Sequence, residues 1–359
     1  MPLSISITSN NKPILQDLAV RFFNDDTAFA ADKVFPVKGV PTIEGSFPIW
    51  VPDHMRKVNM DRAPGAVTNQ LPPQRPTMAA YKLADLGLKV PVIHKDYIGQ
   101  PDPLASIASA AMAEIKRLVQ ATRVNLEDKF VTKALNAANY PAANQITVTG
   151  TKWASTAYAT DNGGKPYDDI VKAKQATIAT CGNEANSMFI SNRLFNVLRA
   201  HPDIQGRMLN TNPGQPTVAN AEAIQALFGL KKLIIGSAVY NSAADTPTQG
   251  LTGTSLYAQS AATDEKVVVW YEEPLSDECH TYGALLYLDA SRSEAKSKIV
   301  DGINAPPSSV GSLVNLTTWD EPDPQATVLR VEADISFEFI ARDSNGLSLA
   351  GAIITNPIQ

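Results

Sequence analysis

The longest stretch of the chain without proline or glycine, residues 104–140, constrains the fold more than any other feature. Asp102 is a suitable N-cap, and Pro103 suits the first helical position, where a backbone N–H has no partner in the helix. We expect a helix over about residues 103–138, which at 1.5 Å per residue is about 54 Å long. A usual helix has only about 11–12 residues, so this one indicates a thin, extended protein. The residues at helical spacing on its apolar face are Leu104, Ile107, Ala108, Ala111, Ile115, Leu118, Val119, Thr122, Leu126 and Phe130.

Residues 36–98 hold nine prolines and still contain strand-like alternation. Because proline cannot donate to a sheet ladder, strands here belong at an edge or in an extended ribbon. We expect an approach strand around Phe47 to Val51, a turn-rich tip at 53–76 and a returning strand at 86–94. A two-stranded hairpin is only marginally stable alone in water. The pattern therefore predicts a long projecting loop that lies on a neighbouring subunit.

The rest of the chain predicts an α+β protein. An amphipathic patch at Ile14 to Phe23 indicates an N-terminal arm that is covered elsewhere. The alternation of Leu329 to Ala341 is the strongest strand signal, and the turn at 343–346 predicts that the chain returns through Thr355 as a hairpin. Short alternating elements indicate a compact domain between these parts: helices at 167–180, 192–200 and 219–228, and strands at 187–190, 232–240, 266–271 and 282–288.

Catalytic and metal-binding patterns are missing from the sequence. Cys181 and Cys279 lie far apart, the four histidines show no ligand spacing, and Gly163-Gly164-Lys165 lacks the remainder of a phosphate-binding loop. We therefore expect no enzyme activity, no cofactor and no metal. No apolar run reaches 18 residues and the first residues do not resemble a secretory signal, which favours a cytoplasmic protein without membrane contact.

Charge is unevenly distributed along the chain. The net charge is -5, which disfavours sequence-specific nucleic-acid binding. Residues 36–98 carry eight basic against five acidic residues, whereas residues 264–359 carry six basic against 16 acidic. These regions either attract one another across a subunit boundary or are separate solvated faces. Our candidate inter-subunit contacts lie in the loop tip: Arg56, Lys57, Arg62, Pro64 and Arg75.

In this order, the parts resemble a tailed-bacteriophage major capsid protein of the Hong Kong 97-type fold, over essentially the whole length. The residues that carry the resemblance are Ala31-Asp32-Lys33-Val34-Phe35-Pro36, Arg62-Ala63-Pro64-Gly65-Ala66 and Asp102-Pro103-Leu104, followed by Phe189-Ile190-Ser191, Leu198-Arg199-Ala200-His201-Pro202, the strand 266–271 before Glu273-Pro274, and the strand 331–340. Each patch is weak singly, and their order is the specific evidence.

The resemblance implies five parts of the chain. These are an N-terminal arm (1–35), an E-loop (36–98), a spine helix with the first part of the peripheral domain (99–165), an axial domain (166–304), and the C-terminal strands of the peripheral domain (305–359). It also implies self-assembly into hexamers and pentamers of an icosahedral head shell. That shell would enclose double-stranded DNA and be built in the host cytoplasm. The partners that the resemblance implies are a portal and scaffolding or decoration proteins. The alternatives are an encapsulin-like nanocompartment shell and a soluble oligomeric α/β enzyme.

Overall fold

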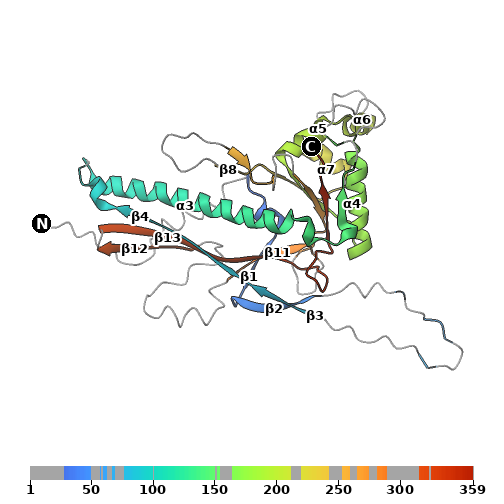
Figure 1. Ribbon diagram of the computed structural model, residues 1–359, viewed down its shortest axis with the longest axis horizontal. Coiled ribbons are helices and arrows are strands. Elements are labelled where there is room, and N and C mark those ends of the chain that lie inside the picture. The colour runs from blue at the N-terminus through green and yellow to red at the C-terminus, as the bar shows by residue number, and fades with distance from the viewer. Residues whose placement is uncertain are drawn as a thin grey trace.

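The computed structural model describes residues 28–49, 57, 60–62, 67–68, 77–99, 101–149, 152–153, 164–211, 220–241, 253–258, 265–274, 281–288, 315–322 and 325–358. Helix α3 (Pro103–Ala134) follows the long axis of an elongated molecule (Figure 1). The long helix is confirmed, although it ends earlier than expected. Asn136 adopts an extended conformation and its side chain accepts a hydrogen bond from the amide of Ala138, which starts the short 3₁₀ helix η3 (Ala137–Asn139) instead.

The first sheet is built around β13, which confirms the strand predicted for Leu329–Ala341. β4 pairs with one edge of β13, β12 and β11 share the other edge, and β1 adds in parallel to β11. The bounds are β1 (Val37–Val40), β4 (Ala84–Ile93), β11 (Gly283–Leu288), β12 (Asn315–Pro322) and β13 (Gln325–Phe339). Buried Leu329, Val331 and Ala333 belong to the same hydrophobic cluster as Ile115 and Leu118 of α3. The helix therefore covers one face of this sheet.

A second sheet has the strand order β5-β14-β10-β6-β7. Its strands are β5 (Gln145–Thr147), β6 (Ser187–Ser191), β7 (Lys232–Gly236), β10 (Val267–Trp270) and β14 (Gly351–Thr355), and its helices are α4 (Pro166–Cys181), α5 (Asn192–Ala200), α6 (Pro202–Thr211) and α7 (Ala221–Leu227). The helices gather at one end of the molecule (Figure 1), where they share a separate hydrophobic cluster with this sheet. The helices and strands predicted between residues 166 and 271 are thus largely confirmed. The strand predicted at 282–288 exists as β11, but it belongs to the first sheet and not to this domain, because it pairs with β13.

The remaining elements are short. A hairpin of β8 (Val239–Asn241) and β9 (Gly253–Ser255) lies beside α3 (Figure 1). The 3₁₀ helix η2 (His94–Tyr97) directly follows β4, and the 3₁₀ helix η4 (Ala142–Asn144) directly precedes β5.

The projecting hairpin has a different returning strand from the predicted one. β2 (Glu44–Ile49) pairs antiparallel with β3 (Thr77–Lys82), whereas the strand expected at 86–94 is β4, which pairs with β13 instead. The physical reason is that the apolar side chains of β4 must be buried. Leu86, Val90 and Val92 alternate on one face of β4 and pack into the cluster beneath α3, which an isolated hairpin could not provide.

The predicted C-terminal hairpin is also wrong, although its turn is present. The Asp343 carboxylate accepts hydrogen bonds from the amides of Asn345 (2.9 Å) and Leu347 (2.8 Å), and Gly346 has a φ of 83°. After this turn, β14 pairs with β10 and β5 rather than with β13. Both edges of β13 are already occupied, and the four buried residues that begin β14 need a position inside a sheet.

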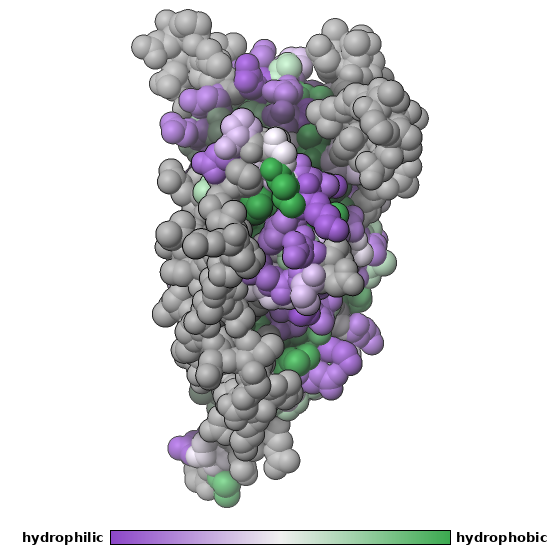
Figure 2. Space-filling view, turned by 90° about the vertical axis from the view of Figure 1, so that its left-hand side faces the viewer, coloured by the Kyte–Doolittle hydropathy of each residue, from purple (hydrophilic) through white to green (hydrophobic). Residues whose placement is uncertain are grey.

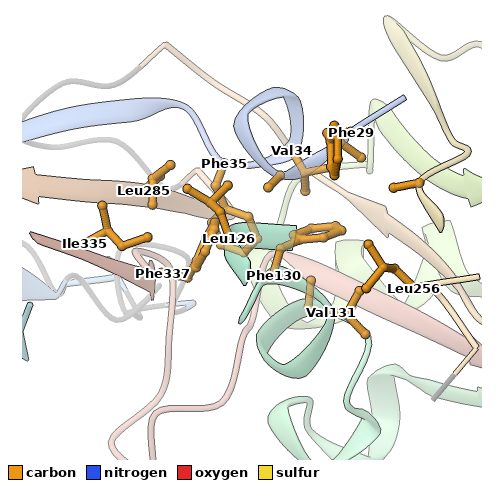
Figure 3. Close-up of a cluster of buried hydrophobic side chains, with 14 of the residues drawn as sticks. Phe29, Val34, Phe35, Leu126, Phe130, Val131, Leu256, Leu285, Ile335 and Phe337 are labelled. Atoms are coloured by element: carbon orange, nitrogen blue, oxygen red, sulfur yellow. The ribbon is translucent and has the colours of Figure 1, made fainter. Parts of the chain in front are cut away.

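The described end of the expected arm is part of the subunit's own core. Phe29, Val34 and Phe35 are buried, with the short helix α2 (Ala31–Val34) between them. The Phe35 ring lies 5.2 Å from Phe337 and 6.0 Å from Phe130, measured between ring centroids, so it joins the strands to the spine helix (Figure 3). The expectation that residues 1–35 find cover elsewhere is therefore wrong for residues 29–35. Residues 1–27 lie outside the described part.

Candidate assembly surface

The base of the β2–β3 hairpin is a well-defined structure. Gly45 lies opposite Tyr81, and a Cβ atom at Gly45 would approach the Tyr81 ring to 2.7 Å, so only glycine allows the ring to lie flat across the strand. The Tyr81 hydroxyl lies 3.1 Å from the hydroxyl of Thr42, and its ring stacks on Phe47 with the centroids 6.4 Å apart. Tyr81 and Leu83 also join a small cluster with buried residues of β1 and β11. The base of the hairpin is thus attached to the body of the subunit.

Arg342 connects this base to the main sheet. Its guanidinium forms an ion pair with Glu338 (3.1 Å), donates to the carbonyl oxygen of Ala80 in β3 (3.2 Å) and lies 5.0 Å from the centre of the Phe47 ring. Lys133 of α3 lies 3.6 Å from the same Glu338 carboxylate. Only 12% and 13% of the Arg342 and Glu338 side chains are exposed. This network fixes the direction in which the hairpin leaves the body.

Two of the five candidate contact residues lie in the described part of the tip, and both are exposed. They are Lys57 and Arg62. The guanidinium of Arg62 donates a hydrogen bond to the Thr68 hydroxyl (2.8 Å). Nearby apolar side chains are exposed as well: Met60 by 87% and Val67 by 92%. Arg56, Pro64 and Arg75 lie outside the described residues. Because nothing in the single chain tests these contacts, all five stay predictions.

The surface elsewhere is mixed in character. On the end face of the molecule, small hydrophobic patches are separated by hydrophilic residues (Figure 2). Three large apolar side chains are also exposed. They are Met78 of β3 (58% exposed), Ile98 just before α3 (63%) and Met112 of α3 (46%). Apolar side chains scattered singly in this way are ordinary on a protein surface and do not by themselves mark a binding site.

The buried carboxylate of Glu127 joins α3 to the start of α2 and to the residues after β9. The Glu127 side chain accepts hydrogen bonds from the amides of Ala30 (3.1 Å) and Ala31 (3.0 Å) and from the Tyr257 hydroxyl (2.8 Å). Burial raises the pKa of Glu127 to about 7, and Asp32 adds to the rise, although the three donors favour the charged form. The carboxylate supplies acceptors for the first amides of α2 and so caps that helix.

Two buried tyrosines hold the end of the spine helix to the sheets. The hydroxyls of Tyr140 and Tyr282 lie 2.5 Å apart, and Tyr140 also donates to the carbonyl oxygen of Ala134 at the end of α3 (2.5 Å). Burial raises the pKa of both hydroxyls above that of a free tyrosine. They remain neutral at physiological pH and act as structural hydrogen-bonding groups.

The described residues offer little for catalysis. Within them, no group of three His, Cys, Asp or Glu side chains is placed to hold a metal ion. None of the described helices combines the length and apolar character that crossing a membrane requires.

Sequence reasoning missed the residues that orient the hairpin. Phe47 was expected only as part of a strand, and Arg342 and Glu338 looked like ordinary polar positions of an alternating strand. Alternation gives no signal for an ion pair that faces another element. Glu127 was likewise missed, although a carboxylate within one turn of Arg123 and Phe130 on a buried helix face could have indicated a polar contact.

Comparison with solved structures accounts for the whole architecture. A phage-related protein from Bordetella bronchiseptica RB50 matches over 98% of both chains, with a TM-score of 0.63 and 16% identity. A putative capsid protein of a prophage of Escherichia coli CFT073 matches over 96% of this chain and 98% of that one, with a TM-score of 0.53 and 14% identity. The chain has the Hong Kong 97-type capsid fold.

Sequence comparison agrees with this fold. The major capsid protein of Burkholderia phage BcepMu is 22% identical over 228 residues, which cover 64% of this chain and 69% of that protein. No family model matches the chain.

Proposed function

We propose that the chain is a phage major capsid protein, a structural protein and not an enzyme, which self-assembles into the icosahedral head shell around the genome of a tailed double-stranded DNA phage. The agreement of the capsid fold over nearly the whole chain carries this proposal. A hairpin with exposed apolar residues at its tip and an anchored base supports it, because such a hairpin gains cover only on another molecule.

In this function the subunits tile as hexamers and pentamers. Lys57 and Arg62, together with Arg56, Pro64 and Arg75, contact the acidic C-terminal third of a neighbour. The shell forms in the host cytoplasm and becomes part of the virion. It includes a portal at one vertex, and scaffolding or decoration proteins are its further partners. It encloses the DNA without sequence-specific contacts, which the acidic balance of the chain favours.

Electron microscopy of the purified chain tests the proposal. We expect closed polyhedral particles of uniform size, and a stable monomer or dimer under all assembly conditions would contradict it. An encapsulin-like shell is the second candidate, since it shares the fold. Particles that copurify with a cargo enzyme would favour that candidate, whereas packaged DNA and a portal vertex would favour the phage head.

Removing the tip of the hairpin tests the role of that element. In the variant, residues 50–76 are replaced by a short linker that joins the end of β2 to the start of β3. We expect a folded subunit that forms particles poorly. Charge reversal of Lys57→Glu with Arg62→Glu tests the proposed contacts in the full chain, with Lys172→Glu on helix α4 as a matched control. Normal particle yield from the double variant would exclude those two residues as assembly contacts.

A further inference from the structure

The strand β4 forms one edge of the first sheet. It pairs with β13 on one side (Figure 1), and no strand in the described part of the chain pairs with its other side. Gly87, Leu88 and Lys89 are exposed in succession, and Leu88 is 40% exposed although it is apolar. An edge strand of this length, about 33 Å at 3.3 Å per residue, presents a row of N–H and C=O groups that can pair with another chain.

A proline shows which backbone groups of β4 point away from β13. Pro91 lies opposite Val328 and has no N–H, so it occupies a position that needs no hydrogen bond to β13. The direction of hydrogen bonding alternates along an antiparallel strand. Asp85, Gly87 and Lys89 therefore direct their N–H and C=O groups outward, away from the sheet.

Gly87 is not required by the structure of its own subunit. A Cβ atom at this position would come no closer than 3.9 Å to the carbonyl oxygen of Val331, which is an ordinary contact. Its φ is not in the left-handed region, and the pairing of β4 with β13 runs from Ala84 to Ile93 without a bulge. A glycine inside a strand weakens the strand and commonly marks a place where another backbone approaches closely.

The charges on either side of Gly87 face like charges within the subunit. Asp85 lies opposite Asp334 of β13, and Lys89 lies opposite Arg330. Like charges directly opposite each other on neighbouring strands destabilise a sheet. Arg330 forms an ion pair in its own strand, whereas Asp85 and Lys89 are exposed at the edge. A partner that presents a basic group to Asp85 and an acidic group to Lys89 would offset this repulsion.

We infer that the edge of β4 is a two-fold contact with a second copy of this chain, in which the two β4 strands pair antiparallel about Gly87. In this register Asp85 of each copy lies opposite Lys89 of the other. The two residues of each pair exchange two hydrogen bonds, and both ion pairs form together because the contact is symmetric. The inference rests on the self-assembly in the proposed function and names a contact that the hairpin tip does not supply.

This register fits the edge better than its neighbours. Pairing centred on residue 85 would place two aspartates opposite each other, and pairing centred on residue 89 would do the same with two lysines. Pairing centred on residue 86 or 88 would place Gly87 opposite one of the charges and leave the ion pairs unmade. The ladder ends at Pro91, which has no N–H, and at Leu83, whose amide donates to the carbonyl oxygen of Ile43 (2.9 Å). Lysine and proline protect an edge against unspecific pairing, so the contact is confined to residues 85–89 and needs a matching carboxylate.

A cysteine at the two-fold centre tests the inference in the assembled full chain. Gly87→Cys fits the subunit, because the added Cβ meets no close neighbour. Its Cα would lie about 5.5 Å from that of its counterpart, which is within the range of a disulfide. We expect mild oxidation to give a covalent dimer, with the linked peptides joined at the two substituted positions. Gly99→Cys, which also lies in open space, is the matched control and should give about tenfold less dimer or lower.

Charge reversals in the Gly87→Cys background test the register. Asp85→Lys and Lys89→Asp each place like charges opposite each other twice, so we expect each to lower the dimer yield about tenfold. A mixture of the two variants should regain the yield, because each chain then carries the charges that the other needs. Neither reversal should destabilise the subunit, since each also removes a like-charge pair with β13. Lys231→Asp, at an exposed lysine before β7, is the control and should leave the yield unchanged.

Three results would overturn the inference. Gly87→Cys could give no more dimer than Gly99→Cys, the single reversals could leave the yield unchanged, or their mixture could link no better than either variant alone. Particles that form normally while Gly87→Cys stays unlinked would overturn this contact and leave the proposed function intact. A linked dimer that never forms particles would support the contact and contradict the proposed function.

Discussion

The guanidinium of Arg342 lies over the ring of Phe47, with 5.0 Å between its central carbon and the ring centre, and so joins the end of β13 to the base of the projecting hairpin. The same side chain bonds to Glu338 and to the backbone of β3. Both residues of the ion pair are nearly buried, so solvent and salt screen it little. The direction in which the base of the hairpin leaves the body is therefore set by contacts within the subunit.

Replacement of Arg342 by Gln should separate folding from assembly. We expect the variant to lose about 1–3 kcal/mol of unfolding free energy, since a hydrogen-bonded charged group is removed, but to stay folded. Particle yield, measured by light scattering, should fall strongly even though the subunit stays folded, because the hairpin is no longer held in one direction. Arg330→Gln is the matched control: its ion pair with Glu332 in the same strand is more exposed, with 46% and 31% of the two side chains accessible, so its loss should cost little. Equal particle yields of the two variants would contradict this role of Arg342.

A methyl group at Gly45 should disturb the hairpin locally. The added Cβ would meet the Tyr81 ring, and overpacking of this kind costs about 1–3 kcal/mol. We expect Gly45→Ala to increase hydrogen exchange in β2 and β3 while thermal unfolding of the body changes little. Gly99→Ala serves as the control, since nothing lies within 4 Å of its added Cβ. Rescue of the exchange pattern by Tyr81→Leu in the Gly45→Ala background would attribute the effect to the ring.

The elements that the sequence predicted well are those that one local pattern determines. The spine helix follows from 37 residues without proline or glycine, and β13 from strict alternation. The buried strand β10 follows from a short apolar run. In each case the side chains that face the core lie on the same element as the signal.

Pairing between distant elements could not be predicted in the same way. β4 and β14 were both recognised as strands, but their partners depend on which sheet edges are free, and that is a property of the whole fold. Arg342 and Glu127 were missed because each bonds to a segment far away in the sequence. The cover over residues 29–35 likewise depends on α3 and β13 coming together, which no short window of the sequence records.

A charge on the buried face of the spine helix should prevent folding. Ile115 is fully buried and Leu118 is 3% exposed, so Ile115→Asp or Leu118→Asp would place an unpaired carboxylate in the core. We expect insoluble protein or the loss of a cooperative thermal transition, because this cost is comparable with the whole stability of a domain. Met112→Asp, on the same helix but 46% exposed, should change stability by less than about 0.5 kcal/mol. A cooperative transition near the original temperature in Ile115→Asp would show that this face is not needed for the fold.

The pH dependence of stability should reveal Glu127. Its pKa rises from 4.5 to about 7 in the folded chain, so between these values the folded state binds a proton that the unfolded state has released. The stabilising contribution of this group is therefore complete below pH 4.5 and is lost as the pH rises through about 7. A shift of this size corresponds to about 3 kcal/mol. Glutamine does not titrate, so the advantage of the natural chain over Glu127→Gln should shrink by up to about 3 kcal/mol between pH 4.5 and pH 8. Denaturant unfolding of both proteins across this range measures the difference, and a gap that stays constant with pH would mean that Glu127 keeps its charge throughout.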